Sequence, residues 1–405
     1  MQESNIKLPD KAVLSGKHLM MGNTAMVEGA LAAGCTFFAG YPITPQNEVP
    51  ERMSKRLPEV GGRFIQMEDE IGSISAVVGA SLAGLKAMTS TSGPGFSLMQ
   101  ETISMAANNE IPCVICDVQR GGPGSGIVSL PHHSDVIQAH YGGNGEYILP
   151  TFAPSTCQDL FDFMIDAFNT AEIYRTPVVV LSDAFLGHNH EQVIIPPADE
   201  IRKKIVPRRR VILDEEGKPL NPSKYRPFSY EDPKNPGHYI IPPPPTIGTE
   251  YYPNWMPTVT HTPDGIPSED SFVATKVNET LKYKIENNAD KICKNDEHFI
   301  DDADIAIICY GLPYRTALRA VKDARNEGIK AGIFRMRVVW PLPEKDIKRV
   351  GETVKTILVP EINLGQILIF IRSIVKCDAN VEPISAVGRL HEPKEILARI
   401  KEANK

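Results

Sequence analysis

The feature of this sequence that most constrains its fold is the alternation of helical and apolar segments between residues 15 and 190. In the segment 158–174, apolar residues recur at a spacing that places them on one face of a helix; they are Leu160, Phe161, Met164, Ile165 and Phe168. The following segment, 176–181, is almost wholly apolar, as in strands of a parallel sheet covered on both faces. The alternation therefore predicts an α/β domain built on a doubly wound parallel sheet.

The same pattern predicts the other elements of this domain. Small residues at helical spacing indicate closely packed helices at 22–33 and 70–85, and a third helix is expected at 96–108. Short apolar segments predict strands at 35–40, 64–67, 86–92 and 112–118. The Gly-Pro-Gly sequence after the strand at 86–92 is expected to form a turn.

Proline divides the chain into three parts. Nearly half of the 34 prolines lie between positions 196 and 267, where we expect an extended strap with little regular structure. The alternation of strands and helices returns from Asp304 onward and predicts a second, smaller α/β domain. The expected organisation is an α/β domain at 15–191, a proline-rich strap at 192–270 and a C-terminal α/β domain at 271–405.

Charge and hydropathy exclude two broad classes of function. The net charge is −7 and no basic patch is evident, which argues against a nucleic-acid partner. No apolar stretch reaches the ~20 residues of a membrane span, and the N-terminus lacks the pattern of a signal peptide. Seven scattered cysteines indicate reduced thiols and a cytoplasmic protein.

Cys113 and Cys116 form a CxxC sequence with two interpretations. The pair could act in redox chemistry or supply half of a metal site. We favour a buried strand, because the surrounding residues are apolar and no second CxxC completes a set of four ligands. The histidines His132, His133 and His140 lie close together without a metal-binding pattern, so surface or packing roles are favoured.

Chemistry in open α/β sheets takes place beyond the carboxyl ends of the strands, where four turns are expected to converge. In YPITP, two prolines restrict the backbone around Thr44, whose hydroxyl either serves a ligand or caps a turn or helix. In QMEDE, the carboxylates either cap the helix that follows or, in the case of Glu70, enter a site. Arg120 precedes a glycine-rich turn and could grip a carboxylate or form a structural ion pair.

The two remaining turns, TSTSGPG and QRGGPGSG, match neither a Walker loop nor a clean GxGxxG sequence. Together with their surroundings, however, they resemble a known family. The stretches GNTAMVEGALAAGCTFFAGYPITP, QMEDEIGSISAVVGASLAG, TSTSGPGFSLMQE, VQRGGPGSG and the distant VPEINLGQ are similar to the α subunit of 2-oxoacid:ferredoxin oxidoreductases. The similarity covers nearly all of residues 15–190 and, more loosely, 300–400.

The resemblance implies an enzyme that uses thiamine diphosphate and coenzyme A to convert a 2-oxoacid oxidatively to an acyl-CoA, CO2 and reduced ferredoxin. The first domain would bind the pyrimidine ring of the cofactor, and the last domain would resemble the C-terminal domain of transketolase. By position in the family motifs, Glu70 would hydrogen-bond the aminopyrimidine, and Thr44 and Arg120 would bind the substrate. Ser92, Gly93 and Tyr41 would line the cofactor.

The resemblance also implies partners, because this sequence lacks the GDG-type motif that binds the diphosphate and lacks clustered cysteines for iron–sulfur ligation. A β subunit would hold the diphosphate, Mg²⁺ and a 4Fe–4S cluster. A γ subunit, and in some arrangements a δ subunit, would complete a dimer of heteromers that reduces ferredoxin.

The substrate stays open between 2-oxoglutarate and a branched-chain 2-oxoacid. A 2-oxoglutarate enzyme needs a second cation for the distal carboxylate, and Lys55, Arg56 and Arg63 are candidates without positional support. The alternative to an enzyme is a non-catalytic assembly subunit of a related redox complex that keeps the fold.

Overall fold

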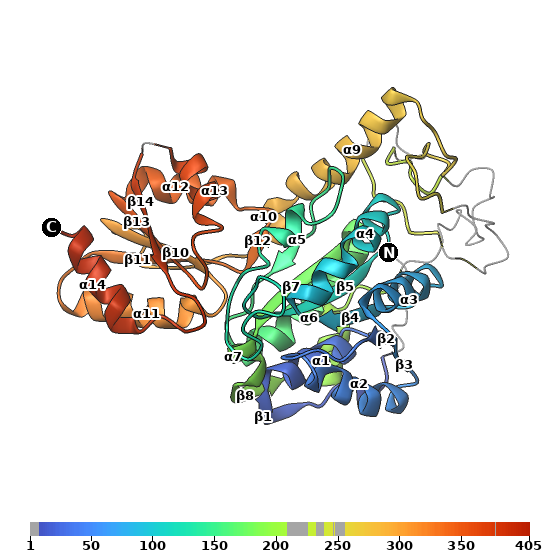
Figure 1. The fold of residues 1–405 in the computed structure, drawn as a ribbon, viewed down its shortest axis with the longest axis horizontal. Coiled ribbons are helices and arrows are strands. Elements are labelled where there is room, and N and C mark those ends of the chain that lie inside the picture. The colour runs from blue at the N-terminus through green and yellow to red at the C-terminus, as the bar shows by residue number, and fades with distance from the viewer. Residues whose placement is uncertain (1–7, 209–225, 232–238, 246, 248–255, 377) are drawn as a thin grey trace.

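The computed structural model of the chain describes residues 8–208, 226–231, 239–245, 247, 256–376 and 378–405. Figure 1 shows two α/β lobes, a larger one that contains the N-terminal half and a smaller one that ends in the C-terminal helix. None of the helices in the described ranges is both long enough and apolar enough to span a membrane.

The larger lobe is built on a sheet of seven strands in the order β12-β6-β7-β5-β4-β2-β3. All neighbouring pairs are parallel except β12 with β6, so the predicted doubly wound parallel sheet is confirmed. The strands from the first part of the chain are β2 (Phe37–Gly40), β3 (Arg63–Gln66), β4 (Ala87–Thr91), β5 (Cys113–Gln119), β6 (Thr151–Phe152) and β7 (Pro177–Asp183). Every residue of β5 and β7 is buried, in agreement with their apolar sequences.

Helices cover both faces of this sheet. Helix α1 packs against α2 and α6, whereas α3 packs against α4. The close approach of α1 and α6 depends on Gly29, since a Cβ atom there would lie 2.3 Å from the carbonyl oxygen of Phe161. The bounds are η1 (Asp10–Ala12), α1 (Gly22–Ala32), α2 (Glu48–Glu59), α3 (Glu70–Leu82), α4 (Gly93–Asn108), α5 (Gln138–Tyr141), α6 (Cys157–Tyr174) and α7 (Ala184–His188).

One local prediction for this lobe was wrong, and one helix was not predicted. The Gly-Pro-Gly sequence at 93–95 is the first turn of α4 rather than a separate turn, because proline is compatible with the first helical positions, where its missing N–H is not needed. Helix α2 was not expected from the sequence; its charged residues and internal Pro58 conceal an amphipathic pattern.

The predicted strap is only partly described. It begins with β8 (His190–Ile195), which pairs antiparallel with β1 (Gly16–Met21), and continues with α8 (Ala198–Lys204). The later described residues, 226–231, 239–245 and 256–270, contain isolated bridges but neither helix nor extended strand. They pack on the larger lobe around the buried Arg175, whose Nη1 donates to the carbonyl oxygens of Pro227 and Pro242. The expectation for 209–225, 232–238, 246 and 248–255 lies outside the described residues.

The smaller lobe has a five-stranded sheet in the order β14-β13-β10-β11-β9, in which only β9 is antiparallel to its neighbour. Its strands are β9 (Asp296–His298), β10 (Ile305–Tyr310), β11 (Ala331–Met336), β13 (Thr356–Glu361) and β14 (Asn380–Ser385). Its helices are α11 (Pro313–Asn326), α12 (Glu344–Thr353), α13 (Leu368–Val375) and α14 (Pro393–Ala403). The second α/β domain that the sequence predicted is therefore present.

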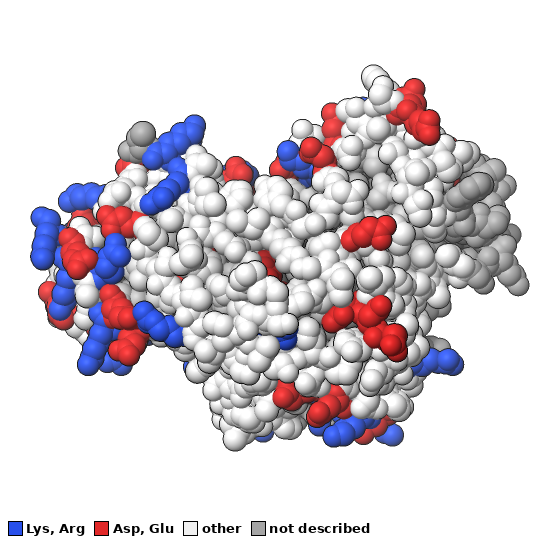
Figure 2. All heavy atoms as spheres, viewed as in Figure 1, with Lys and Arg blue, Asp and Glu red and all other residues white. Residues whose placement is uncertain are grey.

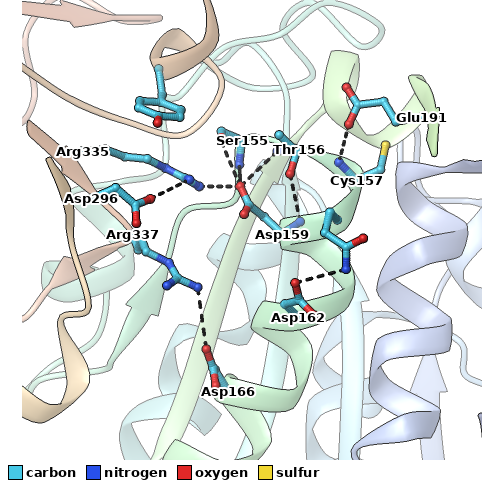
Figure 3. A network of polar contacts seen from close by, with 12 residues as sticks. Ser155, Thr156, Cys157, Asp159, Asp162, Asp166, Glu191, Asp296, Arg335 and Arg337 are labelled. Atoms are coloured by element: carbon cyan, nitrogen blue, oxygen red, sulfur yellow. Dashed lines mark hydrogen bonds and ion pairs between the residues drawn. The ribbon is translucent and has the colours of Figure 1, made fainter. Parts of the chain in front are cut away.

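The two lobes share structure at their junction. Strand β12 (Val338–Trp340) leaves the smaller lobe and adds to the edge of the larger sheet. Figure 3 shows Arg335 of β11 reaching between Asp296 and Asp159, which lies in the first turn of α6. Burial alone would raise the pKa of Asp159, but the charge of Arg335 and the hydrogen bonds from Ser155 outweigh it and lower that pKa.

Before the smaller sheet begins, α9 (Ser271–Glu286) runs along the upper edge of the larger lobe in Figure 1 and leads to α10 (Ala289–Ile292) near the junction of the lobes. Lys284 of α9 is buried there, and its Nζ donates to Glu110 Oε2 at 2.7 Å and to the carbonyl oxygen of Arg175 at 2.9 Å. Removing one partner of a buried ion pair leaves the other charge buried without a counter-charge. The resulting loss of folding free energy is larger than the net contribution of the intact pair.

We therefore expect Lys284→Met to destabilise the chain by about 3 kcal/mol, because Glu110 would stay buried and unpaired. Lys282→Met is the matched control, since Lys282 lies on the same helix and pairs only loosely, at 3.9 Å, with the exposed Glu286. Thermal unfolding of both variants measures the difference. An equal, small shift in melting temperature for both would contradict the assignment of the Lys284–Glu110 pair as an anchor of α9.

Candidate active site

The four predicted turns do meet at one edge of the larger sheet. They follow the carboxyl ends of β2, β3, β4 and β5, which lie side by side in parallel. Direct contacts join them: Arg120 Nη1, after β5, donates to the carbonyl oxygen of Thr44, after β2, at 2.7 Å. The Ser90 hydroxyl of β4 donates to the side chain of Gln46 in the turn after β2.

Arg120 is buried, yet part of its guanidinium is free for a ligand. Its Nε is buried and has no hydrogen-bond partner among the described residues. None of the ion pairs within the described ranges includes Arg120, so the structural alternative raised by the sequence, an internal ion pair, finds no support there. A buried guanidinium with unused donors is suited to bind an anion such as a carboxylate.

Thr44 and Tyr41 both lie in the turn after β2. The N-cap of α2 is Asn47, so Thr44 does not cap that helix. The backbone carbonyl of Thr44 receives the hydrogen bond from Arg120, which places the two predicted substrate residues in contact. The carbonyl of Tyr41 accepts from Gln46 Nε2, and the Tyr41 side chain is 38% exposed, open to a ligand or partner but not enclosed by this chain.

Glu70 is the first residue of α3, and its carboxyl is buried. The capping role belongs to its neighbour Asp69, whose carboxylate accepts from the N–H of Gly72 at 2.7 Å. Glu70 lies against α4, where a Cβ atom on Gly95 would come within 2.5 Å of Glu70 Oε1 and 2.1 Å of Thr91 Oγ1. Burial, and secondly the charge of Asp69, raises the pKa of Glu70 above its ordinary value, while the charge of Arg120 opposes the shift.

Ser92 and Gly93 lie at the start of α4, between Glu70 and Arg120 in the order of the turns. Ser92 is the N-cap residue, and its buried hydroxyl has no hydrogen-bond partner among the described residues. Gly93 lines a cavity of about 810 Å³ with Arg120, His132 and Ser134 of the same lobe. The opposite wall of this cavity comes from the smaller lobe and includes Asn363 and Gln366.

Two further buried carboxyls lie near this cavity: Asp135 lines it, and Asp117 is a neighbour of Asp135. Asp117 stands inside β5, and Asp135 lies in the segment between β5 and α5. Burial, and then the proximity of the other carboxyl, raises the pKa of Asp117, and burial likewise raises the pKa of Asp135. Two neighbouring buried carboxyls disfavour each other's charged form. An acidic residue within an otherwise apolar strand was the available signal.

The remaining candidates fall into structural roles. Cys113 and Cys116 are buried in β5, as the strand interpretation predicted. His133 packs against Tyr310, and its Nε2 lies 3.1 Å from Asp183 Oδ2, which confirms a packing role. Within the described ranges, no three His, Cys, Asp or Glu side chains are grouped so as to hold a metal ion.

The three cations considered for a distal carboxylate do not reach this cavity. Arg56 is engaged with Glu28 of α1 at 3.1 Å and with Glu59 of α2, so it forms structural ion pairs within and between these helices. Lys55 and Arg63 are exposed and are absent from the cavity lining.

Comparison with protein families identifies both lobes. Residues 28–275 match the family described as pyruvate flavodoxin/ferredoxin oxidoreductase, thiamine diphosphate-binding. Residues 303–396 match the pyruvate:ferredoxin oxidoreductase core domain II.

Similar proteins match along nearly their whole length. The 2-oxoglutarate synthase subunit KorA of Methanothermobacter marburgensis is 42% identical over 395 residues, which cover 96% of this chain and 99% of the relative. The KorA subunit of Methanocaldococcus jannaschii is also 42% identical, over 93% of this chain and 97% of the relative. The ketoisovalerate oxidoreductase subunit VorB of M. marburgensis is 33% identical over 95% of this chain and 97% of the relative.

Two solved structures share the fold. A 2-oxoglutarate:ferredoxin oxidoreductase from Magnetococcus marinus, with 2-oxoglutarate, coenzyme A and succinyl-CoA bound, superposes with a TM-score of 0.87 and 31% identity. The match covers 96% of this chain and 66% of that chain. A split-gene transketolase superposes with a TM-score of 0.52 at 13% identity and supports the fold alone.

The raised pKa of Glu70 makes a prediction about stability. Because the native state binds this proton more tightly than the unfolded chain does, its contribution to stability is present at low pH. That contribution is lost as pH rises from the ordinary value of 4.5 through the raised native pKa. Glu70→Gln cannot titrate, so its melting temperature relative to the wild type should rise between pH 4 and pH 7.5. Glu68→Gln, at an exposed neighbour, is the control; a flat difference for Glu70→Gln would contradict the burial argument.

Proposed function

Since the chain belongs to the pyruvate flavodoxin/ferredoxin oxidoreductase family, we propose that it is the α subunit of an enzyme that acts on 2-oxoglutarate. The matches to the two family models and to the similar proteins confirm the family and the fold class expected from the sequence. The reaction is the oxidative decarboxylation of a 2-oxoacid with coenzyme A, which yields acyl-CoA, CO2 and reduced ferredoxin. The preference for 2-oxoglutarate over a branched-chain acid is supported by the higher identity to the KorA relatives, 42% against 33% for VorB.

One observation carries the proposal for the site: a buried guanidinium with unused donors lies at the wall of a cavity, next to a buried carboxyl of raised pKa. Arg120 is assigned to the carboxylate adjacent to the keto group, because its planar fork matches a carboxylate with two parallel hydrogen bonds. Thr44 fixes the guanidinium through its carbonyl oxygen and leaves its own hydroxyl available to the substrate. These roles agree with the resemblance noted in the sequence.

The environment of Glu70 fits the aminopyrimidine ring of thiamine diphosphate. A raised pKa keeps the carboxyl protonated closer to neutrality, so that it can donate to a ring nitrogen. The absence of a Cβ on Gly95 leaves room for the Glu70 side chain against α4, and the Ser92 hydroxyl offers a second polar group. We assign Glu70 as the catalytic residue, with Ser92, Gly93 and Tyr41 lining the cofactor.

When bound, thiamine diphosphate supplies the electron sink that permits loss of CO2 from a 2-oxoacid. The residues of this chain bind and orient the cofactor and the substrate. Glu70 holds and transfers a proton at the ring nitrogen, and Arg120 holds the substrate carboxylate. Thr44 and Arg120 are tied to different strand ends, so their relative position is set by the sheet. Positioning of this kind contributes by fixing the reacting groups before the reaction begins.

The proposal includes partner subunits, because the site residues found in the described ranges serve the pyrimidine half of the cofactor. A β subunit would hold the diphosphate, Mg²⁺ and a 4Fe–4S cluster, and a γ subunit, with or without a δ subunit, would complete a dimer of heteromers. Ferredoxin is the electron acceptor. The free, buried thiols of the described cysteines support a cytoplasmic location.

A surface with few charged side chains lies next to the site, and we propose that the β subunit binds there. In Figure 2 the charged side chains gather on the smaller lobe and at the periphery, whereas the centre of the face carries few. Figure 1 draws the segment between β5 and α6 over this centre. Exposed apolar side chains lie on that segment and on the neighbouring loop of the smaller lobe: Ile127, Val128, Leu130 and Leu364. An apolar surface next to an incomplete site is typical of a subunit interface.

The alternative is a non-catalytic assembly subunit, which would not need Glu70 and Arg120 in an arrangement that can bind a cofactor and a substrate. Glu70 is buried beside Gly95, and Arg120 keeps free donors at the cavity, which favours an active site. The deciding experiment is a panel of 2-oxoacids with coenzyme A and a low-potential acceptor, measured on the complete complex. We expect 2-oxoglutarate to give the highest kcat/KM; a preference for branched-chain acids would overturn the substrate, and no turnover with any 2-oxoacid would favour the alternative.

Arg120→Lys tests the carboxylate role, because lysine keeps the charge but loses the planar fork. We expect KM for the 2-oxoacid to rise about tenfold, which corresponds to about 1.4 kcal/mol, with little change in KM for coenzyme A. Arg63→Lys, at an exposed position on β3, is the control. Equal changes of both KM values in Arg120→Lys would count against direct binding of the substrate carboxylate.

A further inference from the structure

The segment that carries much of the cavity wall has almost no regular structure of its own. Residues 121–137 connect β5 to α5, and their backbone makes a single isolated bridge, between Gly121 and Ile127. Residues 122–130 are exposed. We call residues 121–137 the cavity loop. Since such a loop is not held by a helix or a sheet, its position next to Arg120 must be fixed from outside.

The smaller lobe provides that support through the turn after β13. The Asn363 side chain donates to the carbonyl oxygen of His133 at 2.8 Å, and the N–H of His133 donates to the carbonyl oxygen of Ile362 at 2.8 Å. Asn363 is itself held, because its Oδ1 accepts from the backbone of Gly365 and Gln366. The Glu361 carboxyl accepts the N–H groups of Ile367 and Leu368 at 3.0 Å and so fixes the far side of the turn.

Gln366 binds the cavity loop with both ends of its side-chain amide. Its Nε2 donates to the carbonyl oxygen of Ser134 at 2.7 Å, and its Oε1 accepts from the N–H of Ile137 at 3.1 Å. This arrangement imitates the pairing of one strand with another, and it satisfies a donor and an acceptor of the loop backbone.

Ser134 links Gln366 to Arg120, the residue assigned to the substrate carboxylate. The Ser134 hydroxyl lies 3.1 Å from the carbonyl oxygen of Arg120, to which it donates. Gln366, Ser134 and Arg120 all line the same cavity. The chain of contacts therefore runs from the smaller lobe, through the cavity loop, to the backbone of Arg120.

We propose that Gln366 is a positioning residue for the 2-oxoacid, through which the smaller lobe holds the cavity loop and Arg120 in the geometry that binds the substrate carboxylate. The inference rests on the proposed function of Arg120. It gives the smaller lobe a role in substrate binding that the site residues of the larger lobe do not supply by themselves. Gln366 is the last residue of VPEINLGQ, a sequence that no site assignment above has used.

The test is Gln366→Met in the complete complex, since methionine keeps the length of the side chain but removes both hydrogen bonds. The matched control is Gln158→Met. Gln158 likewise pairs with the backbone through both ends of its amide, to the N–H and carbonyl oxygen of Ile194, but on the far side of α6. The two substitutions thus remove the same kind of contact from two different places.

We expect Gln366→Met to raise KM for the 2-oxoacid about tenfold, with KM for coenzyme A within about twofold of the wild type. Gln158→Met should leave both KM values unchanged. A merely structural role of Gln366 would change both KM values together or neither, and either result would overturn the proposal. Gln366→Glu provides a second variant that keeps the acceptor for Ile137, replaces the donor to Ser134 by an acceptor and adds a negative charge at the cavity wall.

Hydrogen exchange separates failure of this inference from failure of the proposed function. Amide exchange of peptides from residues 121–137 should become at least about tenfold faster in Gln366→Met and stay unchanged in Gln158→Met. This measurement needs no turnover, so it remains informative if the wild-type complex fails to act on any 2-oxoacid. Unchanged exchange of the cavity loop in both Gln366 variants would show that Gln366 does not hold it.

Discussion

The candidate site depends on one constraint, the parallel alignment of β2, β3, β4 and β5. Because these strands run in the same direction and their register is fixed by hydrogen bonds, the four turns that follow them share one edge of the sheet. Thr44, Glu70, Ser92 and Arg120 stand in four different turns, separated by many residues of sequence. The hydrogen bond from Arg120 to Thr44 and the contact of Glu70 with α4 are consequences of that alignment.

The second lobe is more than an appended domain. Strand β12 extends the larger sheet, Arg335 binds Asp159 across the junction, and the turn after β13 holds the cavity loop. The first two connections come from neighbouring positions, the end of β11 and β12, and the third comes from the turn after β13. A lobe tied at several points cannot rotate freely against its neighbour, which suits a cavity whose walls come from both.

Much of this structure could be predicted from the sequence, since buried parallel strands and amphipathic helices leave clear periodic patterns. Thr44, Glu70 and Arg120 were candidates from their places at the strand ends, but their roles, and the choice of Ser92, Gly93 and Tyr41, came only from resemblance to a family, because turns have no periodicity. Helix α2 escaped notice because half of its residues are charged and it contains Pro58. Asp117 could have been noticed as an acidic residue within an apolar strand, whereas Gln366 stands in a motif whose spatial partner lies more than 200 residues earlier. Contacts of that kind are set by tertiary packing, which a local pattern does not encode.

The central claim is that this sheet edge forms half of an active site, the half that holds the pyrimidine ring of the cofactor. The most direct measurement is a calorimetric titration of thiamine diphosphate, with Mg²⁺ present, into the purified chain and into the complete complex. The account predicts tight binding to the complex, clear weakening in a complex that carries Glu70→Gln, and little or no binding to the chain alone. Tight binding to the isolated chain, or affinity unaffected by Glu70→Gln, would contradict it.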